Sequence, residues 1–250
     1  MPALNVYQAG TVLVAQFNRE KPLNPLNREL EQSIVETCRW AQAEPAINAI
    51  VLTGGVDRSF GVGDDLNEAR EISTPAGVED LIDRTVGLYV AILSVTKPVV
   101  AGMDGYAIGA GLQIALCCDW RVGTATTKAL GWELKQGLAC PIGAYMLRKS
   151  FGRSAMSDII FGCEIVPPAW GLEHKFFNEI ADGRDVVERA IRRASVLGEY
   201  PQFAYQRTKE AANHSFIAGL RELKPMAKDI ILDGFRSSSA QAHFSRIMRR

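Results

Sequence analysis

A glycine-rich segment, residues 97–121, carries the strongest chemical signal in the sequence. Val99 and Val100 predict a buried strand, and the apolar residues that follow predict a helix over 110–117. Glycines between the two let the backbone approach a ligand closely, and the first N–H groups of a helix have no acceptor within it. We therefore expect backbone donors here that can hold an anion or a developing oxyanion. Gln113 is the polar side chain on that helix.

A second segment, residues 58–68, reads RSFGVGDDLNE and follows a predicted strand. Its glycines also allow a close backbone approach, and either Asp64 or Asp65 can cap the helix that starts after them. Taken alone, this pattern is equally typical of a plain turn from a strand to a helix.

A third segment, residues 132–137, places Glu133 among the apolar residues Leu130, Trp132, Leu134 and Leu138. A carboxylate in apolar surroundings is suited to proton transfer. The alternative is an exposed loop glutamate that pairs with Lys135.

The overall composition excludes several classes of protein. The 250 residues include 28 basic and 28 acidic side chains, so the formal net charge is zero and nothing favours a nucleic-acid partner. We see no signal peptide and no apolar run long enough for a membrane span, and we expect a cytoplasmic protein. The five cysteines lack zinc spacing and the three histidines lie far apart, so we expect reduced thiols and no metal site.

Strands and helices alternate along the first part of the chain, which predicts an α/β fold with a mostly parallel sheet. The predicted strands are residues 4–8, 11–17, 47–53 and 98–103, and the helices are 27–44, 66–72, 78–95 and 110–117. Beyond residue 141 we expect helices at 141–151, 154–162, 186–200, 203–212 and 224–235. We divide the chain into an α/β core, residues 1–190, and a helical C-terminal region, residues 191–250.

The order of these three motifs resembles the crotonase superfamily, the enoyl-CoA hydratase/isomerase fold. The matching stretches are SF-x-x-GxDL-x-E, then KPVVAGMDGYAIGAGLQIALCCDWR, then WELKQG…PIGA. The resemblance implies a spiral of ββα units with a helical C-terminal region, assembled as a homotrimer or homohexamer. It also implies a coenzyme A thioester as the substrate, with no separate cofactor. Residues 1–190 would then bind the acyl-CoA, and residues 191–250 would serve as a trimerisation or lid region.

The resemblance further implies roles for particular residues. The thioester oxygen would lie between the backbone N–H groups of Asp64 and Ala110, and the two acid/base positions fall on Gln113 and Glu133. The residues expected to bind coenzyme A or the acyl group are Lys21, Pro22, Leu23, Asn24, Asp64, Asp65, Leu66, Asn67, Gly109 and Trp132.

The amide side chain of Gln113 argues against one reaction of the superfamily, the hydration of an enoyl thioester. An amide cannot exchange a proton at neutral pH, so hydration by two carboxylates is disfavoured. Within the superfamily, the chain most resembles the carboxymethylproline synthase branch, although the tryptophan and histidine of that branch's amino-acid pocket fall on Leu81 and Ile231. We therefore expect chemistry on a CoA-enolate, either malonyl-CoA decarboxylation with C–C bond formation or enoyl-CoA isomerisation. The alternatives are a hydratase with one catalytic glutamate and a non-catalytic acyl-CoA-binding subunit.

Overall fold

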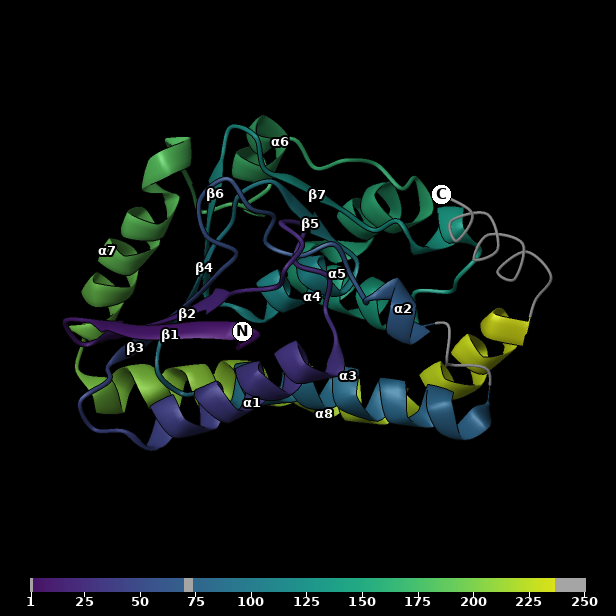
Figure 1. Cartoon of the computed structure of the whole chain (residues 1–250). Coiled ribbons are helices and arrows are strands. Elements are labelled where there is room, and N and C mark those ends of the chain that lie inside the picture. Colours follow the sequence, from purple (N-terminus) through teal and green to yellow (C-terminus); the bar gives the residue numbers. More distant parts are fainter. Residues whose placement is uncertain (1, 70–73, 237–250) are drawn as a thin grey trace.

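The computed structural model of the protein describes residues 2–69 and 74–236. Six strands form one sheet in the order β1-β2-β3-β4-β6-β8, in which only the β1–β2 pair is antiparallel (Figure 1). The short strands β5 and β7 pair in parallel beside it. The strands are β1 Leu4–Ala9, β2 Val12–Phe17, β3 Ala49–Thr53, β4 Val99–Gly102, β5 Tyr106–Ile108, β6 Trp120–Thr124, β7 Lys128–Leu130 and β8 Glu179–Ala181.

Helices cover both faces of this sheet, which confirms the predicted α/β class. The α-helices are α1 Arg28–Ala43, α2 Leu66–Ala69, α3 Pro75–Ser94, α4 Ala110–Cys117, α5 Pro141–Met156, α6 Pro168–Glu173, α7 Val186–Gly198 and α8 Gln202–Arg236. The remaining helical turns are the 3₁₀ helices η1 Glu133–Gln136 and η3 Gly183–Asp185 and the π-helix η2 Ser157–Phe161. None of the described helices is both long and apolar enough to cross a membrane.

The central strands divide the apolar core into two layers. Every residue of β3 and β4 is buried, as expected for a parallel sheet covered on both faces. Successive side chains point to opposite faces, so Val51 packs toward α7 while Leu52 packs toward α1 and α3. The larger layer surrounds α4 and fixes the glycine-rich turn that precedes it.

The ends of two predicted helices show how local chemistry sets them. The side chain of Asn27 accepts a hydrogen bond from the Leu30 N–H at 3.0 Å, which confirms it as the N-cap of α1. α3 begins earlier than predicted, because Thr74 caps it and Pro75 occupies its first position. Proline there has no N–H that the helix needs, so Pro75 starts the helix instead of preceding it.

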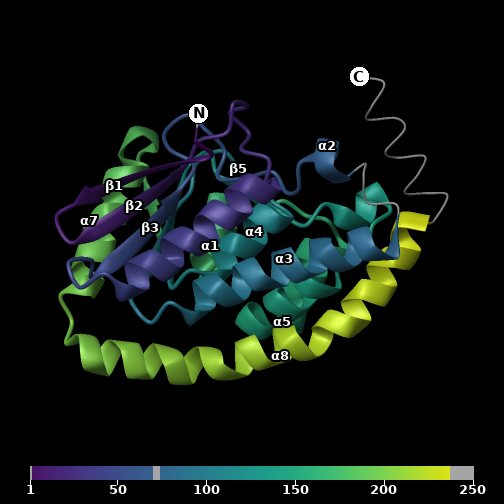
Figure 2. The same ribbon diagram turned by 60° about the horizontal axis from the view of Figure 1, so that its bottom comes forward.

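The C-terminal region differs from the prediction of two separate helices. Residues 202–236 form one continuous helix that contains Pro225, and it curves across α3 and α5 (Figure 2). Buried polar contacts hold it: Lys209 donates to the Lys97 carbonyl at 2.9 Å and to the Asp119 carboxylate at 2.6 Å. Packing along this length outweighs the hydrogen bond that a proline removes. The end of the predicted helix 66–72 and the segment 237–250 lie outside the described residues.

Candidate active site

Two glycine-containing turns lie side by side at the start of α4. The Gly61 N–H donates to Tyr106 at 3.0 Å, and the Ile108 N–H donates back to the Gly61 carbonyl at 2.8 Å. A Cβ on Gly111 would clash with that carbonyl, so glycine is required for the close approach. A Cβ on Gly63 would lie 3.9 Å from the backbone nitrogen of Ala110. The predicted oxyanion segments are therefore adjacent in space.

Each turn presents an unpaired backbone donor. Ala110 is the first residue of α4, and its N-cap, Gly109, has a φ of 54°, which favours glycine. Within the described parts of the chain, no acceptor is found for the N–H of Ala110 or for that of Asp64. Two such donors on neighbouring turns can stabilise one thioester oxygen as it becomes negative.

Glu133 lies next to this pair of donors. Its Oε1 accepts hydrogen bonds from Gln113 Nε2 and from Cys140 Sγ, each with a donor–acceptor distance of 3.1 Å. Its Oε2 is buried, and no partner for it is found in the described structure. A Cβ on Gly109 would lie 3.4 Å from Oε1, so the glycine leaves room for the carboxylate beside the turn.

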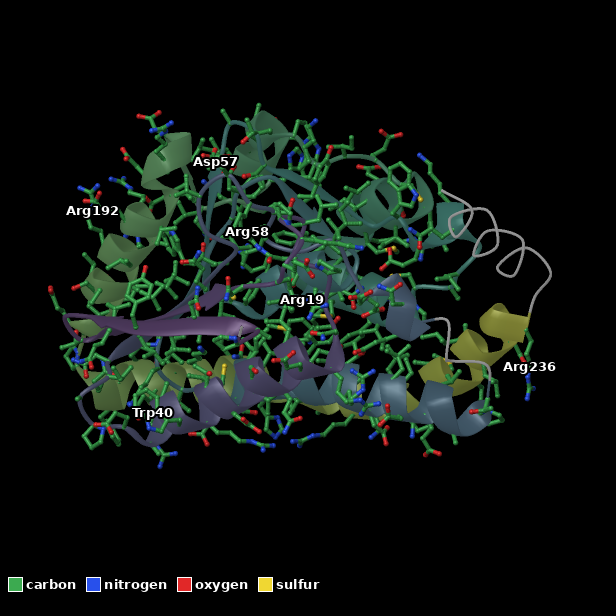
Figure 3. The ribbon with its side chains drawn as sticks, viewed as in Figure 1. Arg19, Trp40, Asp57, Arg58, Arg192 and Arg236 are labelled. Atoms are coloured by element: carbon green, nitrogen blue, oxygen red, sulfur yellow. The ribbon has the colours of Figure 1, made fainter. Side chains whose placement is uncertain are left out.

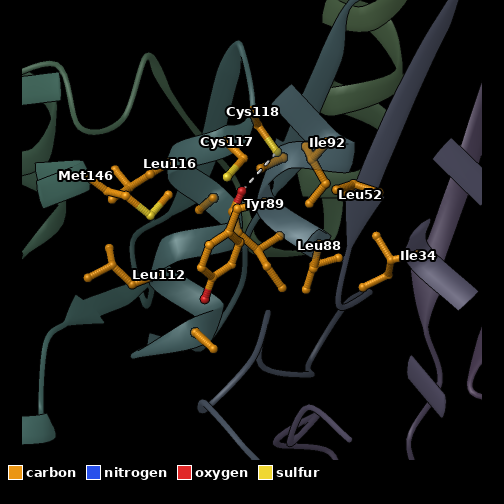
Figure 4. Close-up of a cluster of buried hydrophobic side chains, with 14 of the residues drawn as sticks. Ile34, Leu52, Leu88, Tyr89, Ile92, Leu112, Leu116, Cys117, Cys118 and Met146 are labelled. Carbon is orange, nitrogen blue, oxygen red and sulfur yellow. Dashed lines mark hydrogen bonds between the residues drawn. The ribbon is translucent and has the colours of Figure 1, made fainter. Parts of the chain in front are cut away.

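A small cavity of about 90 Å³ connects these groups. Asp64, Ala110, Gln113 and Glu133 line one part of it, and Ile231 of α8 closes another part. Helix α3 supplies the rest of the polar wall through Thr85 and Tyr89, whose hydroxyls are buried without a partner in the described chain. Figure 4 shows the Tyr89 ring packed between Leu88 and Leu112. Sequence analysis missed both hydroxyls, although their i, i+4 spacing on the inward face of α3 could have indicated them.

The charges around the cavity differ in their surroundings. The surrounding protein and then the nearby Glu133 charge together raise the pKa of the Asp64 carboxyl to about 6, although part of this side chain is exposed to solvent. Burial and then the Glu133 charge raise the pKa of the Cys140 thiol well above its usual value. Cys140 is therefore a neutral hydrogen-bond donor at the site. Among the residues that line the cavity in the described structure there is no lysine, arginine or histidine.

The two segments predicted to bind coenzyme A are held together by polar contacts. Arg19 forms an ion pair with Asp65 at 2.8 Å, and Arg58 donates to the carbonyl of Arg19 and to the Asn24 side chain. Figure 3 shows Arg19 and Arg58 in the middle of the molecule, away from Arg192 and Arg236 at its ends. Asn24 is fully buried and donates to the Ser59 carbonyl at 2.7 Å, so its side chain shapes the loop.

Four of the other residues expected to bind coenzyme A lie at the surface. Lys21, Pro22, Leu23 and Asn67 are exposed, whereas Gly109 is buried. Asp65, and not Asp64, caps the short helix α2, because its Oδ1 accepts from the Asn67 N–H at 3.0 Å. Of the two aspartates that the sequence offered as the cap of this helix, Asp65 is therefore the one that caps it.

The surroundings of Glu133 differ from the sequence interpretation. Trp132 and Leu134 do not shield the carboxylate, because their side chains are 38% and 41% exposed. The Lys135 ammonium lies over the Trp132 ring, with its Nζ 5.3 Å from the ring centroid, and Trp132 does not line the cavity. A 3₁₀ turn points successive side chains in different directions, so Glu133 turns inward while its neighbours turn outward. The pairing of Glu133 with Lys135 does not occur in the described structure.

Nothing in the described ranges resembles a metal centre, since no group of three or more histidine, cysteine, aspartate or glutamate side chains could hold an ion. The polar groups at the site are instead backbone donors, one amide, one thiol, two hydroxyls and two carboxyls. This set suits the stabilisation of an oxyanion and the transfer of protons.

Comparison with known proteins identifies the family. Residues 7–244 match the family model described as enoyl-CoA hydratase/isomerase, and the chain belongs to this crotonase family. It is 36% identical to a carboxymethylproline synthase of Pectobacterium carotovorum over 237 residues, which cover 95% of each protein. It is 28% identical to a 2,3-dehydroadipyl-CoA hydratase of Escherichia coli, over 86% of this chain and 83% of that protein.

Solved structures agree with this assignment. ThnE from S. clavuligerus matches with a TM-score of 0.78 and 29% identity, covering 90% of this chain and 99% of that one. OdaA of Pseudomonas aeruginosa matches over 100% of both chains with a TM-score of 0.87, and at 23% identity this likeness concerns the fold alone.

Proposed function

We propose that this protein is an enzyme that forms a CoA-enolate from malonyl-CoA by decarboxylation and uses it to make a C–C bond. The observation that carries the proposal is the pairing of Glu133 with the amide of Gln113, next to the free N–H groups of Asp64 and Ala110. The similarity to a carboxymethylproline synthase along nearly the whole chain supports the same reaction.

The chemistry follows from these groups. Loss of CO₂ breaks a C–C bond of the malonyl thioester and leaves the electron pair on the enolate, so this step needs no base. Two preorganised N–H donors stabilise the enolate oxygen, and removing such a donor typically costs about 3–4 kcal/mol of transition-state stabilisation. The enolate carbon then attacks an electrophilic carbon of an acceptor. Leu81 and Ile231 form an apolar part of the cavity wall. Because these positions match the tryptophan and histidine of the synthase branch's amino-acid pocket, we expect the acceptor to differ from that of the related synthase.

Isomerisation of an enoyl-CoA is the second candidate, because Glu133 alone could move one proton. Its free Oε2 is buried at the cavity and could accept a proton from the α-carbon. Gln113 cannot take part in a proton transfer, which disfavours the hydration carried out by the E. coli relative.

Parallel assays with malonyl-CoA, a 3-enoyl-CoA and crotonyl-CoA, followed by mass spectrometry, test the proposal. We expect the release of CO₂ and the formation of acetyl-CoA from malonyl-CoA. A Glu133→Gln variant should lose reactions that need a base, such as isomerisation, and keep the decarboxylation, which needs none. Rapid hydration of crotonyl-CoA with no turnover of the other two thioesters would overturn the proposal. No turnover of any of the three thioesters by the wild-type protein, above the rate without protein, would favour a non-catalytic acyl-CoA-binding subunit.

We also propose a homotrimeric or homohexameric assembly and a cytoplasmic location for this enzyme. Light scattering after size-exclusion chromatography tests the first, and fractionation of cells that express the protein tests the second.

A further inference from the structure

The cavity contains a second carboxyl group that the chemistry above does not use. The Asp64 side chain lines the same cavity as Glu133, and its own N–H is one of the two free donors. The position held by a carboxylate in two-carboxylate sites is an amide here, Gln113. The structure thus has a carboxyl group from a different loop in the same cavity as Glu133.

The two carboxyl groups differ in their hydrogen bonds. Glu133 accepts two hydrogen bonds at Oε1, from Gln113 and Cys140. The Asp64 side chain has no hydrogen bond or ion pair to any described residue, and its pKa is raised to about 6. Pairs of carboxyl groups that differ in this way commonly divide into a base and an acid.

The charged and titratable groups near Asp64 come from four elements. Glu133 of η1 and Glu68 of α2 favour the neutral carboxyl, and Arg84 of α3 favours the charged one. Glu31 of α1 forms an ion pair with Arg84, and its negative charge partly offsets the effect of the Arg84 charge on Asp64. The Tyr89 hydroxyl of α3, whose pKa is raised well above its usual value by burial, remains neutral. Negative neighbours therefore predominate around Asp64, and a bound enolate adds one more.

We propose that the carboxyl group of Asp64, in its neutral form, is the acid that protonates the CoA-enolate in this cavity. The inference rests on the proposed function. When no acceptor is present, the O–H bond of Asp64 breaks, a new C–H bond forms at the α-carbon, and acetyl-CoA results. When an acceptor is present, a C–C bond forms at that carbon and the proton goes to the heteroatom that receives the electron pair. Asp64 then regains its proton from solvent.

The experiment measures acetyl-CoA formation from malonyl-CoA, without an acceptor, between about pH 5 and about pH 8. A neutral carboxyl is present below its pKa, so the wild-type rate should fall as the pH rises above about 6. Asp64→Asn should lower the rate about 100-fold and remove this fall, because an amide carries no transferable proton. Asp64→Ala should do the same, and it serves if the first variant fails to fold. Asp83→Asn removes an exposed carboxylate of α3 and should keep the wild-type profile.

A second measurement separates this inference from the proposed function. Exchange of the acetyl-CoA α-protons for deuterium in D₂O requires an enolate but neither malonyl-CoA nor an acceptor. If the wild-type protein neither decarboxylates malonyl-CoA nor catalyses this exchange, the proposed function fails and the role of Asp64 fails with it. If the wild type is active and both Asp64 variants match its rate and pH profile, the role of Asp64 alone is overturned.

Discussion

The Cys140 thiol donates a hydrogen bond to Glu133 Oε1 at a distance of 3.1 Å, and Cys140 is the N-cap residue of α5. Gln113 donates to the same oxygen, and its Nε2 also lies 3.8 Å from the sulfur. Two neutral donors thus fix one carboxylate oxygen and leave Oε2, which has no partner in the described structure, as the oxygen available to a substrate. This makes Cys140 a positioning residue, one that acts through Glu133.

Replacing Cys140 tests this role. Cys140→Ala removes a donor to Glu133. It should lower kcat about tenfold for a reaction in which Glu133 moves a proton, such as isomerisation of a 3-enoyl-CoA, the effect of losing one hydrogen bond of roughly 1.5 kcal/mol to a charged group. KM for the acyl-CoA should change little, since the thiol does not lie on the coenzyme A segments. Cys140→Ser keeps a donor of similar size and should restore most of kcat. Steady-state kinetics check the prediction, and equal losses in the two variants would indicate a packing role only.

The backbone N–H of Ala110 can be deleted with little change to the fold. Ala110 is the first residue of α4, a position that tolerates proline because its N–H has no helical acceptor. Ala110→Pro should therefore keep the thermal melting temperature within a few degrees and lower kcat about 100- to 1,000-fold. Circular dichroism and steady-state kinetics provide the two readouts. A variant that retains full activity would show that this N–H does not stabilise the enolate oxygen.

The sequence predicted the main elements of the fold because their signals are local. The apolar spacing of α1, the N-cap Asn27 and the boundaries of α4 agree with the structure almost residue by residue. The strands β5, β6, β7 and β8 were missed. Three residues are too few to show a periodic pattern in β5, β7 and β8, and Arg121 and Gly123 interrupt the apolar pattern in β6. The continuity of α8 through Pro225 was missed as well, because it depends on packing against α3 and α5.

The candidate site was predicted less completely, for a similar reason. The glycine turns and the pairing of Gln113 with Glu133 were found because they occur in ordered motifs. A chemical role for the side chain of Asp64 was not considered, because only the three-dimensional structure shows that it lines the same cavity as Glu133. The inward direction of Glu133 between two exposed apolar residues also depends on a single 3₁₀ turn, which apolar spacing cannot reveal.

The raised pKa of Asp64 has a consequence for stability. The folded protein keeps a proton on this group up to about pH 6, whereas the unfolded chain releases it near the ordinary value of 3.8. The free energy of unfolding should therefore fall as the pH rises through this interval, and Asp64→Asn should abolish that part of the fall. Because solvent reaches the side chain, we expect a modest effect. At pH values above about 6 the variant should melt about 2–4 °C higher, which corresponds to about 1 kcal/mol.

Thermal melts of both proteins at several pH values check this prediction. The contribution of Glu31, whose pKa is raised to about 7 mainly by burial, acts in the same direction but is present in both proteins, so it cancels in the difference. A melting-temperature difference that is the same at about pH 4 and at about pH 7 would contradict the predicted titration of Asp64.

Gln113→Glu tests whether the amide sets the reaction. Glutamate has nearly the same shape, so it fits the tight space beside Gly143 and Cys140, where a Cβ on Gly143 would lie 3.0 Å from Gln113 Nε2. The change removes a donor to Glu133 and adds a carboxylate that can orient and activate water. Hydration of crotonyl-CoA should rise at least about tenfold, and acetyl-CoA formation from malonyl-CoA should fall, because three carboxyl groups then surround the enolate. Wild-type hydration that is already fast, and that this variant leaves unchanged, would contradict the role given to Gln113.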